Sequence, residues 1–421
     1  MPFTLNQSDM SQIRAADVGQ IQSKLSPLST RHTWLSVGNS IQSGNPPKEK
    51  VAFDALPAAD IIELIATRGP LHVADGWGYL ARAMSALLAG DAHAARHLAY
   101  YAELRAALSI LANDGIGVFN GQNRVVDSAG VLRQLQNQGT HAMCWAALEF
   151  WASEPQSIQK LLLATQINGA RLVDAIQVFF PGMSAGALGG ALIREWGFDL
   201  QVGHLDRDDR NLSSYNPNSL TPLNTLPADD LAFIGSLWGA FEPNSWTLER
   251  HLLRKLLETL QGVVGGATLG QRTTEYQYLD ERLKPFVSMD FLARNEDPDN
   301  HPLIEAAKDA SSPAPAHSML ARGALLLALG GWMSERNLRD AMVQPYAHLQ
   351  SWWRTYGAER GIWSAGSEPT NMADLWVDVS DALADLASGP HPTRHQLIQA
   401  GGGAVWRLCE AERIGLWNLC R

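Results

Sequence analysis

Apolar side chains recur at spacings of three and four along most of the chain, which is the period of helices that bury one face. The clearest run begins at Asp91, whose side chain can cap a helix, and ends at Gly115, which can stop one. A second stripe on this helix consists of small side chains, namely Ala99, Ala102, Ala106 and Ser109. Small side chains let a neighbouring helix approach closely, so we expect this helix to organise the fold.

The period changes directly after Gly115. Apolar and β-branched residues flank Asn120 and Gly121, and an Asn-Gly pair favours the tight turn of a β-hairpin. The sequence therefore predicts a mainly α fold, a multi-helix bundle-like assembly with one short β-hairpin near residues 116–127.

Polar segments divide the rest of the helical pattern. Residues 1–50 contain few large apolar side chains and are predicted to form a polar N-terminal arm or extended lead-in. Residues 51–197 and 228–421 are predicted to form two helical domains. Residues 198–227, dominated by Asp, Asn, Ser and Pro, are expected to be a polar loop or linker between them.

Three local predictions concern helix boundaries. Residues 58–67 and 76–88 are expected to form two separate helices, and residues 184–196 a further one. Pro345 is expected to kink or break the helix predicted at residues 335–356, because proline lacks the backbone N–H that a helix interior requires.

Composition limits the classes of protein to consider. The 421 residues are 46% hydrophobic and 18% charged, which is ordinary for a globular protein. A formal net charge of −10 argues against non-specific nucleic-acid binding as the main activity, while a local basic site stays open. The 14 tryptophans outnumber both phenylalanine and tyrosine, and we expect them to form large helix–helix contacts, some of them between chains.

Cysteine usage and the first residues indicate a cytoplasmic protein. The three cysteines form no CxxC pair, which fits a reducing compartment and gives no thiolate zinc cluster. The N-terminus lacks the basic start and apolar core of a signal peptide. The longest apolar run, near residues 323–332, is far shorter than the ~20 residues that cross a bilayer, so we expect no membrane association.

The helix at residues 92–114 resembles the signature helix of HEPN-type domains. The resemblance covers about twenty residues and rests on Ala99-Tyr100-Tyr101-Ala102, Arg105-Ala106-Ala107-Leu108 and the closing Gly115. HEPN-type proteins occur widely in prokaryotic toxin–antitoxin and anti-phage defence systems. The resemblance therefore implies a helical protein that works in such a setting.

HEPN ribonucleases also carry an arginine followed, after four to six residues, by a histidine. Arg294 and His301 fit this spacing with six intervening residues, whereas Arg133 and His141 have seven. The resemblance implies that such a pair acts at the 2′-hydroxyl and scissile phosphate of RNA, where the chemistry requires a base and a cation. The segment between Arg294 and His301 is polar, so a solvated loop is the alternative interpretation.

Four aspartates form an acidic stripe on one predicted helix, opposite its apolar residues: Asp374, Asp378, Asp381 and Asp385. Carboxylates stacked in this way can hold Mg²⁺ or dock a basic partner. A metal site usually needs facing ligands as well, so a solvated helix face is the alternative interpretation.

Other candidate groups carry weaker signals. His141 and Cys144 are close enough on one helix to touch, and His93–His97 and His391–His395 have the spacing of some metal-ligand pairs. The glycine-rich runs at 186–190, 262–266 and 401–403 match no phosphate-binding loop, so no nucleotide or other cofactor is predicted.

The leading interpretation is a helical subunit of a cytoplasmic bacterial multi-protein complex, active in anti-phage defence and acting mainly through protein–protein contacts rather than as an enzyme. One alternative is a HEPN-type ribonuclease that uses Arg294 and His301. The other is an all-α metal-dependent enzyme that uses the aspartate stripe.

Overall fold

A computed structural model describes residues 3–183, 206–208, 211, 227–294, 301–309, 311, 314–387 and 393–420. These residues are mainly helical, with two small antiparallel sheets, which confirms the predicted fold class. The helix predicted at residues 184–196 and nearly all of the polar segment 198–227 lie outside the described residues.

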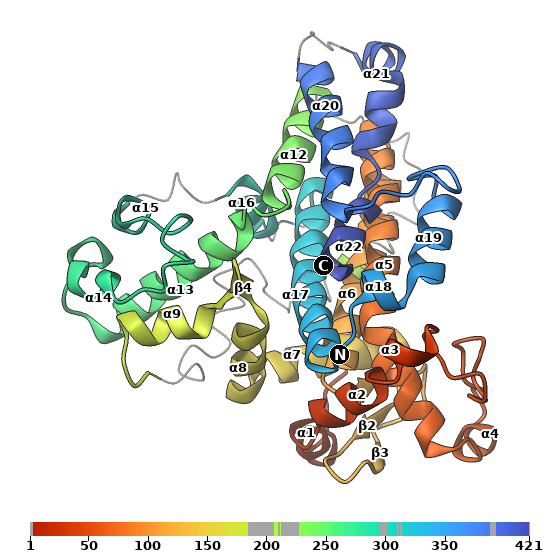
Figure 1. The fold of residues 1–421 in the computed structure, drawn as a ribbon. Coiled ribbons are helices and arrows are strands. Elements are labelled where there is room, and N and C mark those ends of the chain that lie inside the picture. The colour runs from red at the N-terminus through yellow and green to blue at the C-terminus, as the bar shows by residue number, and fades with distance from the viewer. Residues whose placement is uncertain are drawn as a thin grey trace.

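Three long helices form the centre of the molecule: α5 (Ala58–Leu88), α6 (Ala92–Asn113) and α17 (Ala316–Asp340) (Figure 1). The small-residue stripe of α6 faces α17, as the sequence predicts. A Cβ placed at Gly323 of α17 would lie 3.5 Å from the Cβ of Ala102, and one at Gly330 would lie only 2.9 Å from the hydroxyl oxygen of Ser109. Glycines on one helix and small residues on the other thus bring the two backbones together.

A buried polar network fixes how these three helices meet. The Asn113 side-chain amide donates to the Ser334 hydroxyl at 2.8 Å, and the Asn337 side-chain amide donates to the backbone oxygen of Asn113 at 2.9 Å. The Ser109 hydroxyl donates to the backbone oxygen of Gly69 in α5 at 2.7 Å. Buried polar groups favour the one alignment in which all are paired, so the network specifies the register of α5, α6 and α17.

Helix α5 differs from its prediction because it is one continuous helix across residues 58–88, with Pro70 inside it. Proline removes one helical hydrogen bond. Pro70 is buried, however, and most of the helix packs against α6 and α17. Tertiary packing therefore outweighs the local break signal.

The predicted hairpin is present and larger than expected. Strands β1 (Ile116–Gly117) and β2 (Arg124–Val126) pair antiparallel, and Asn120 and Gly121 both have positive φ, as the turn requires. A third strand, β3 (Leu132–Gln134), adds to β2. Its short, mostly polar sequence carries no alternation that would predict it.

The N-terminal residues fold onto the body of the chain. They form α1 (Gln7–Arg14), α2 (Val18–Leu25) and α3 (Leu28–Arg31), followed by α4 (Lys50–Asp54). Four apolar side chains of this region are completely buried in a core shared with α5: Ile21, Leu25, Leu28 and Phe53. Burial of even a few large side chains is sufficient to hold a mostly polar segment in place.

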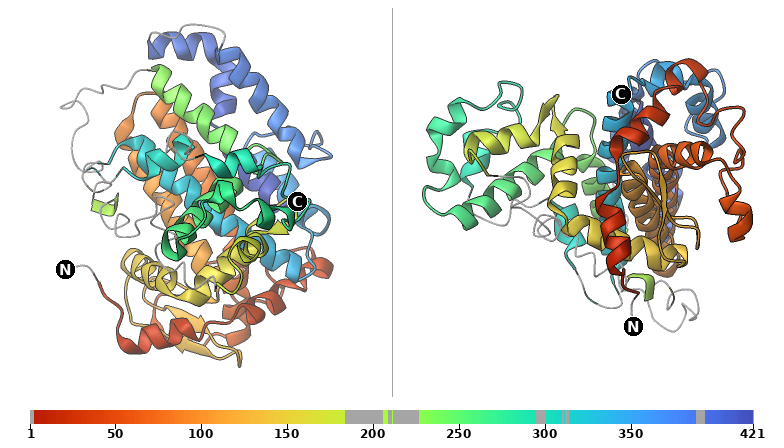
Figure 2. Two further views of the ribbon diagram at one scale, coloured as in Figure 1. Left: turned by 90° about the vertical axis from the view of Figure 1, so that its left-hand side faces the viewer. Right: turned by 90° about the horizontal axis from the view of Figure 1, so that it is seen from below.

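A group of shorter elements lies to one side of the central helices (Figures 1 and 2). In chain order it contains α7 (Thr140–Ser153), α8 (Pro155–Ala164), β4 (Gln166–Ile167), β5 (Ala170–Arg171), α9 (Leu172–Phe179), α13 (Thr247–Val264), η3 (Leu269–Gln271), α14 (Thr273–Gln277), α15 (Met289–Ala293) and α16 (Pro302–Ala307). Helix α12 (Pro227–Ala240) connects this group to the end of α5.

The last part of the chain returns to the central helices. Helix α17 ends before Met342, which has positive φ, and Pro345 starts α18 (Pro345–His348), so the predicted break is confirmed. Helix α19 (Gln350–Glu359), η5 (Met372–Asp374), α20 (Leu375–Ala387), α21 (Arg394–Leu408) and α22 (Glu412–Leu419) follow. Gly415 of α22 packs closely on Trp77 of α5, where a Cβ would lie 2.9 Å from the indole ring.

One apolar core contains side chains from both predicted helical segments, including α5 to α7 and α12 to α22. Six tryptophans are among its largest completely buried side chains: Trp77, Trp145, Trp151, Trp238, Trp353 and Trp417. Six further tryptophans are partly buried and pack against a core: Trp34, Trp246, Trp332, Trp352, Trp363 and Trp376. Within the described residues, no helix has both the length and the apolar character needed to cross a membrane.

Candidate functional site

The four predicted aspartates lie together on one side of η5 and α20, and all four are exposed. The opposite side of the helix buries Leu375, Val379, Ala382 and Leu386, as its amphipathic sequence predicts. The aspartates are therefore brought onto one face, but their environments differ.

Asp378 is held by a cluster of buried charges rather than facing a second ligand. Its carboxylate lies 3.0 Å from Arg413 of α22 and 3.8 Å from Arg407 of α21. Arg413 is completely buried, donates to Glu410 at 2.7 Å and also donates to the backbone oxygen of Leu375 at 2.9 Å. This cluster fixes the base of α20 to α21 and α22.

A second set of contacts fixes α21 to the body. The Arg394 guanidinium lies 2.7 Å from the buried carboxylate of Asp230 in α12 and donates to the backbone oxygen of Leu87 at the end of α5. His317 of α17 lies 2.8 Å from the other oxygen of Asp230. Helices α20 and α21 are therefore anchored to α5, α12, α17 and α22, although they project from one end of the molecule (Figure 1).

Large apolar side chains are exposed beside the aspartates. Trp406 of α21 is 63% exposed and Val377 of α20 is 57% exposed. The ion pair between Asp378 and Arg407 shows that the segments carrying these two side chains lie next to each other. We call the surface formed by Asp374, Val377, Asp381 and Trp406 the α20–α21 face.

The charge on the α20–α21 face is negative. Within the described part of the chain, Asp374 and Asp381 form no ion pair, whereas Asp378 is neutralised by two arginines. The face thus combines an exposed tryptophan and valine with two unneutralised carboxylates. Exposed aromatic side chains bordered by charge are typical of protein-binding surfaces.

Arg294 and His301 lie in a second cluster, at the end of α15 and the start of α16. Arg250 of α13 is close to both, since its positive charge contributes to the lowered pKa of His301 and the charge of Arg294 lowers the pKa of Arg250 itself. Burial is the larger cause in each case and lowers the pKa of His301 to about 4. His301 is therefore a neutral imidazole at pH 7.

Aromatic and cationic side chains surround this pair. The His251 and His301 rings are 6.0 Å apart, and the guanidinium groups of Arg250 and Arg254 lie 5.6 and 5.5 Å from the Phe291 ring centre. The Nε–H of Arg250 is buried and has no hydrogen-bond acceptor among the described residues. The six residues between Arg294 and His301 lie outside the described part.

The other sequence candidates are part of the packing. His141 shares a 2.7 Å hydrogen bond with the Tyr100 hydroxyl, and burial raises the pKa of the neighbouring Cys144 thiol far above its usual range. All three cysteines are buried and unpaired. His391 lies outside the described residues, so the pair His391–His395 has no described geometry.

Metal-ligating side chains do not gather in the described residues: no group of three or more His, Cys, Asp or Glu side chains is placed to hold a metal ion there. The sequence did not identify Trp406, Val377, Arg250 or His251 as candidates. Only Arg250-His251 carried a visible signal, a cation and an imidazole side by side on an amphipathic helix.

Comparisons with protein-family models, with curated proteins and with solved structures found no match to this chain.

Proposed function

We propose that this chain is a helical subunit of a multi-protein complex, and that its α20–α21 face binds a basic segment of a partner protein. The observation that carries the proposal is the 63% exposure of Trp406 on α21, next to the segment of η5 and α20 that carries unneutralised carboxylates. A tryptophan in this environment gains free energy when a partner covers it, because its large apolar surface leaves water.

The chemistry of the face selects the partner. Trp406 and Val377 require an apolar group opposite them, while Asp374 and Asp381 require Lys or Arg around that group. The net charge of −10 on the whole chain adds a long-range attraction for such a segment. A short amphipathic segment with both basic and apolar side chains meets these requirements.

Rigidity supports the same role. The buried Arg413 cluster and the Arg394–Asp230 ion pair hold α20 and α21 in place before any partner arrives. A preformed surface binds with a smaller loss of conformational entropy than a mobile one. The setting implied by the HEPN-like helix, a cytoplasmic complex of a prokaryotic defence or toxin–antitoxin system, is part of this proposal.

Site-specific photo-cross-linking tests the proposal in the native host. A photoreactive amino acid at Ser380, which is exposed on α20 next to the face, is expected to link a peptide that contains several basic residues and at least one large apolar residue. The matched control carries the same amino acid at Tyr278, which is 76% exposed in a different part of the molecule. A linked acidic peptide, a second copy of this chain or no linked peptide at Ser380 would reject the proposal.

A second candidate function is RNA cleavage at Arg294 and His301. The specific observation in its favour is Arg250, which lies close to both predicted residues and has a buried, unpartnered Nε. A neutral imidazole beside arginines can accept a proton from a 2′-hydroxyl while a guanidinium binds the phosphate.

A cleavage assay on single-stranded RNA distinguishes this candidate from the first. The purified wild-type chain is expected to cleave, and His301→Asn is expected to abolish cleavage while it keeps an acceptor at the start of α16. The control Trp406→Ser is expected to cleave like wild type. Absence of cleavage by the wild-type chain, or full activity of His301→Asn, would remove the ribonuclease candidate.

A further inference from the structure

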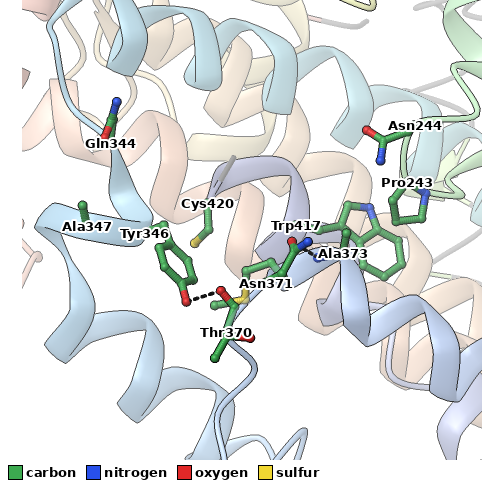
Figure 3. A pocket seen from close by; sticks show the side chains of 11 residues that line it. Pro243, Asn244, Gln344, Tyr346, Ala347, Thr370, Asn371, Ala373, Trp417 and Cys420 are labelled. Carbon is green, nitrogen blue, oxygen red and sulfur yellow. Dashed lines mark hydrogen bonds between the residues drawn. The ribbon is translucent and has the colours of Figure 1, made fainter.

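A cavity of about 490 Å³ lies beside η5, between four segments that are distant in sequence. The turn after α12 contributes Asn244, the turn between α17 and α18 contributes Gln344, the segment before η5 contributes Asn371, and α22 contributes Trp417 (Figure 3). Its volume is within the range of small-molecule sites.

The cavity lining is uncharged and mixes apolar side chains with a few polar ones. None of its eleven lining residues carries a charged side chain, whereas three of them are side-chain amides. The side-chain oxygen of Asn371 accepts from the backbone N–H of Ala373 at 3.0 Å. This bond does not use the side-chain N–H groups of Asn371. No hydrogen bond between described residues uses the side-chain amides of Asn244 or Gln344.

Trp417 provides an independent observation that points to a ligand. Its side chain is 1% exposed and its indole N–H has no acceptor among the described residues. Figure 3 places the indole nitrogen on the side of Pro243 and Asn244, at the wall of the cavity. A buried donor without an acceptor costs roughly 1–3 kcal/mol, so an acceptor oxygen in the cavity would be stabilised there.

The walls of the cavity are held firmly. The Tyr346 hydroxyl donates to the backbone oxygen of Thr370 at 2.5 Å, which ties α18 to the segment before η5. Trp417 packs against Trp238 and Trp376, with ring centres 6.0 and 6.3 Å apart. Asn244 adopts a left-handed φ of 64°, a conformation that non-glycine residues hold mainly where the surrounding structure requires it.

We infer that this cavity binds a small uncharged molecule that carries several carbonyl or hydroxyl oxygens, of the size of a nucleoside or a monosaccharide. The unpartnered indole N–H and the side-chain amides donate to those oxygens, and amide oxygens accept from the hydroxyl or N–H groups of the same ligand. The absence of a cationic group from the described lining disfavours phosphorylated ligands, because nothing there would replace the hydration of a dianion.

Titration of the full-length chain with neutral nucleosides and with monosaccharides tests the inference and separates the two sources. Ligand-detected NMR and calorimetry measure the binding. Saturable binding is expected for at least one neutral compound, and its phosphorylated counterpart is expected to bind more weakly. The class that binds identifies the source of the ligand.

Two variants examine the donors separately. Trp417→Phe keeps an aromatic ring but loses the N–H, and is expected to raise the Kd about fivefold. Asn244→Gly removes the amide while it accepts the left-handed φ, so it tests the amide without backbone strain. Tyr278→Phe, distant from the cavity, is the control for both.

Binding of no neutral compound, or wild-type affinity in both Trp417→Phe and Asn244→Gly, would overturn the inference. Retained binding in Trp406→Ser would show that the cavity works independently of the α20–α21 face.

Discussion

Arg413 illustrates how single buried charges determine the structure around the proposed binding face. It is completely buried, and its guanidinium connects Glu410, Asp378 and the backbone oxygen of Leu375. The sequence gives no sign of this role, because an arginine in an amphipathic helix is usually exposed. Three-dimensional packing alone reveals that this residue holds α20, α21 and α22 together.

Replacement of Arg413 by methionine is expected to reduce the free energy of unfolding by roughly 1.5–3 kcal/mol, since it removes one of the two arginines that pair with the buried Glu410 carboxylate and leaves only Arg407. Chemical denaturation measures the loss. Arg171→Met is the matched control, because Arg171 and its partner Asp174 are each about half exposed, and it should change stability much less. Equal effects of the two variants would contradict the structural role of Arg413.

His301 makes a prediction about pH. Burial and the nearby Arg250 lower the pKa of His301 to about 4, whereas an unfolded histidine titrates near 6.5. The unfolded chain therefore binds this proton first as the pH falls, so the contribution of His301 to stability is lost between pH 6.5 and 4. The loss amounts to at most about 3 kcal/mol.

Unfolding measured at several pH values checks this expectation. His301→Asn should show a flatter decline in stability between pH 6.5 and 4 than wild type, while His395→Asn, which changes an exposed histidine, should follow the wild-type curve. His72 also has a lowered pKa and keeps contributing in both variants. An unchanged slope in His301→Asn would show that His301 is not the group responsible.

At the scale of elements, the small-residue stripe of α6 could be predicted because it repeats within one helix. Its partner, α17, could not be predicted, since the two helices are separated by about 200 residues and nothing in the stripe specifies what packs on it. The same limit explains Pro70, whose break signal is local while the packing that overrides it is not. The third strand, β3, was not predicted because its sequence lacks the alternation of apolar and polar residues that indicates a strand.

The contact between α6 and α17 gives a matched pair of substitutions. A methyl group at Gly330 would lie 2.9 Å from the Ser109 hydroxyl oxygen, whereas at Gly331 the nearest atom is 3.9 Å away. Gly330→Ala is expected to destabilise the protein by about 1–3 kcal/mol. Gly331→Ala is expected to be neutral or to stabilise by up to about 1 kcal/mol, because alanine favours helices.

Thermal and chemical unfolding of the two glycine variants decide whether the helices approach this closely. A stability of Gly330→Ala that equals that of Gly331→Ala would mean that α6 and α17 lie further apart.

For the whole molecule, the sequence predicted the mainly α class and the acidic helix face, but not the surface that accompanies it. The exposure of Trp406 depends on how α21 lies on α20, and most other tryptophans are buried in a core or pack against one, so residue type alone could not distinguish it. The cavity beside Trp417 likewise joins four segments that only the fold brings together. The division at residues 198–227 stays a prediction, although one core spans both flanking segments.

The central claim is that the α20–α21 face binds a basic partner segment. Its most direct measurement is the Kd of the cross-linked partner for wild type, Trp406→Ser, Asp374→Asn/Asp381→Asn and the control Tyr278→Ser. We predict that Trp406→Ser weakens binding tenfold or more, that the double aspartate variant weakens it and reduces its dependence on salt, and that Tyr278→Ser binds like wild type. Wild-type affinity in both Trp406→Ser and the aspartate variant would contradict the claim.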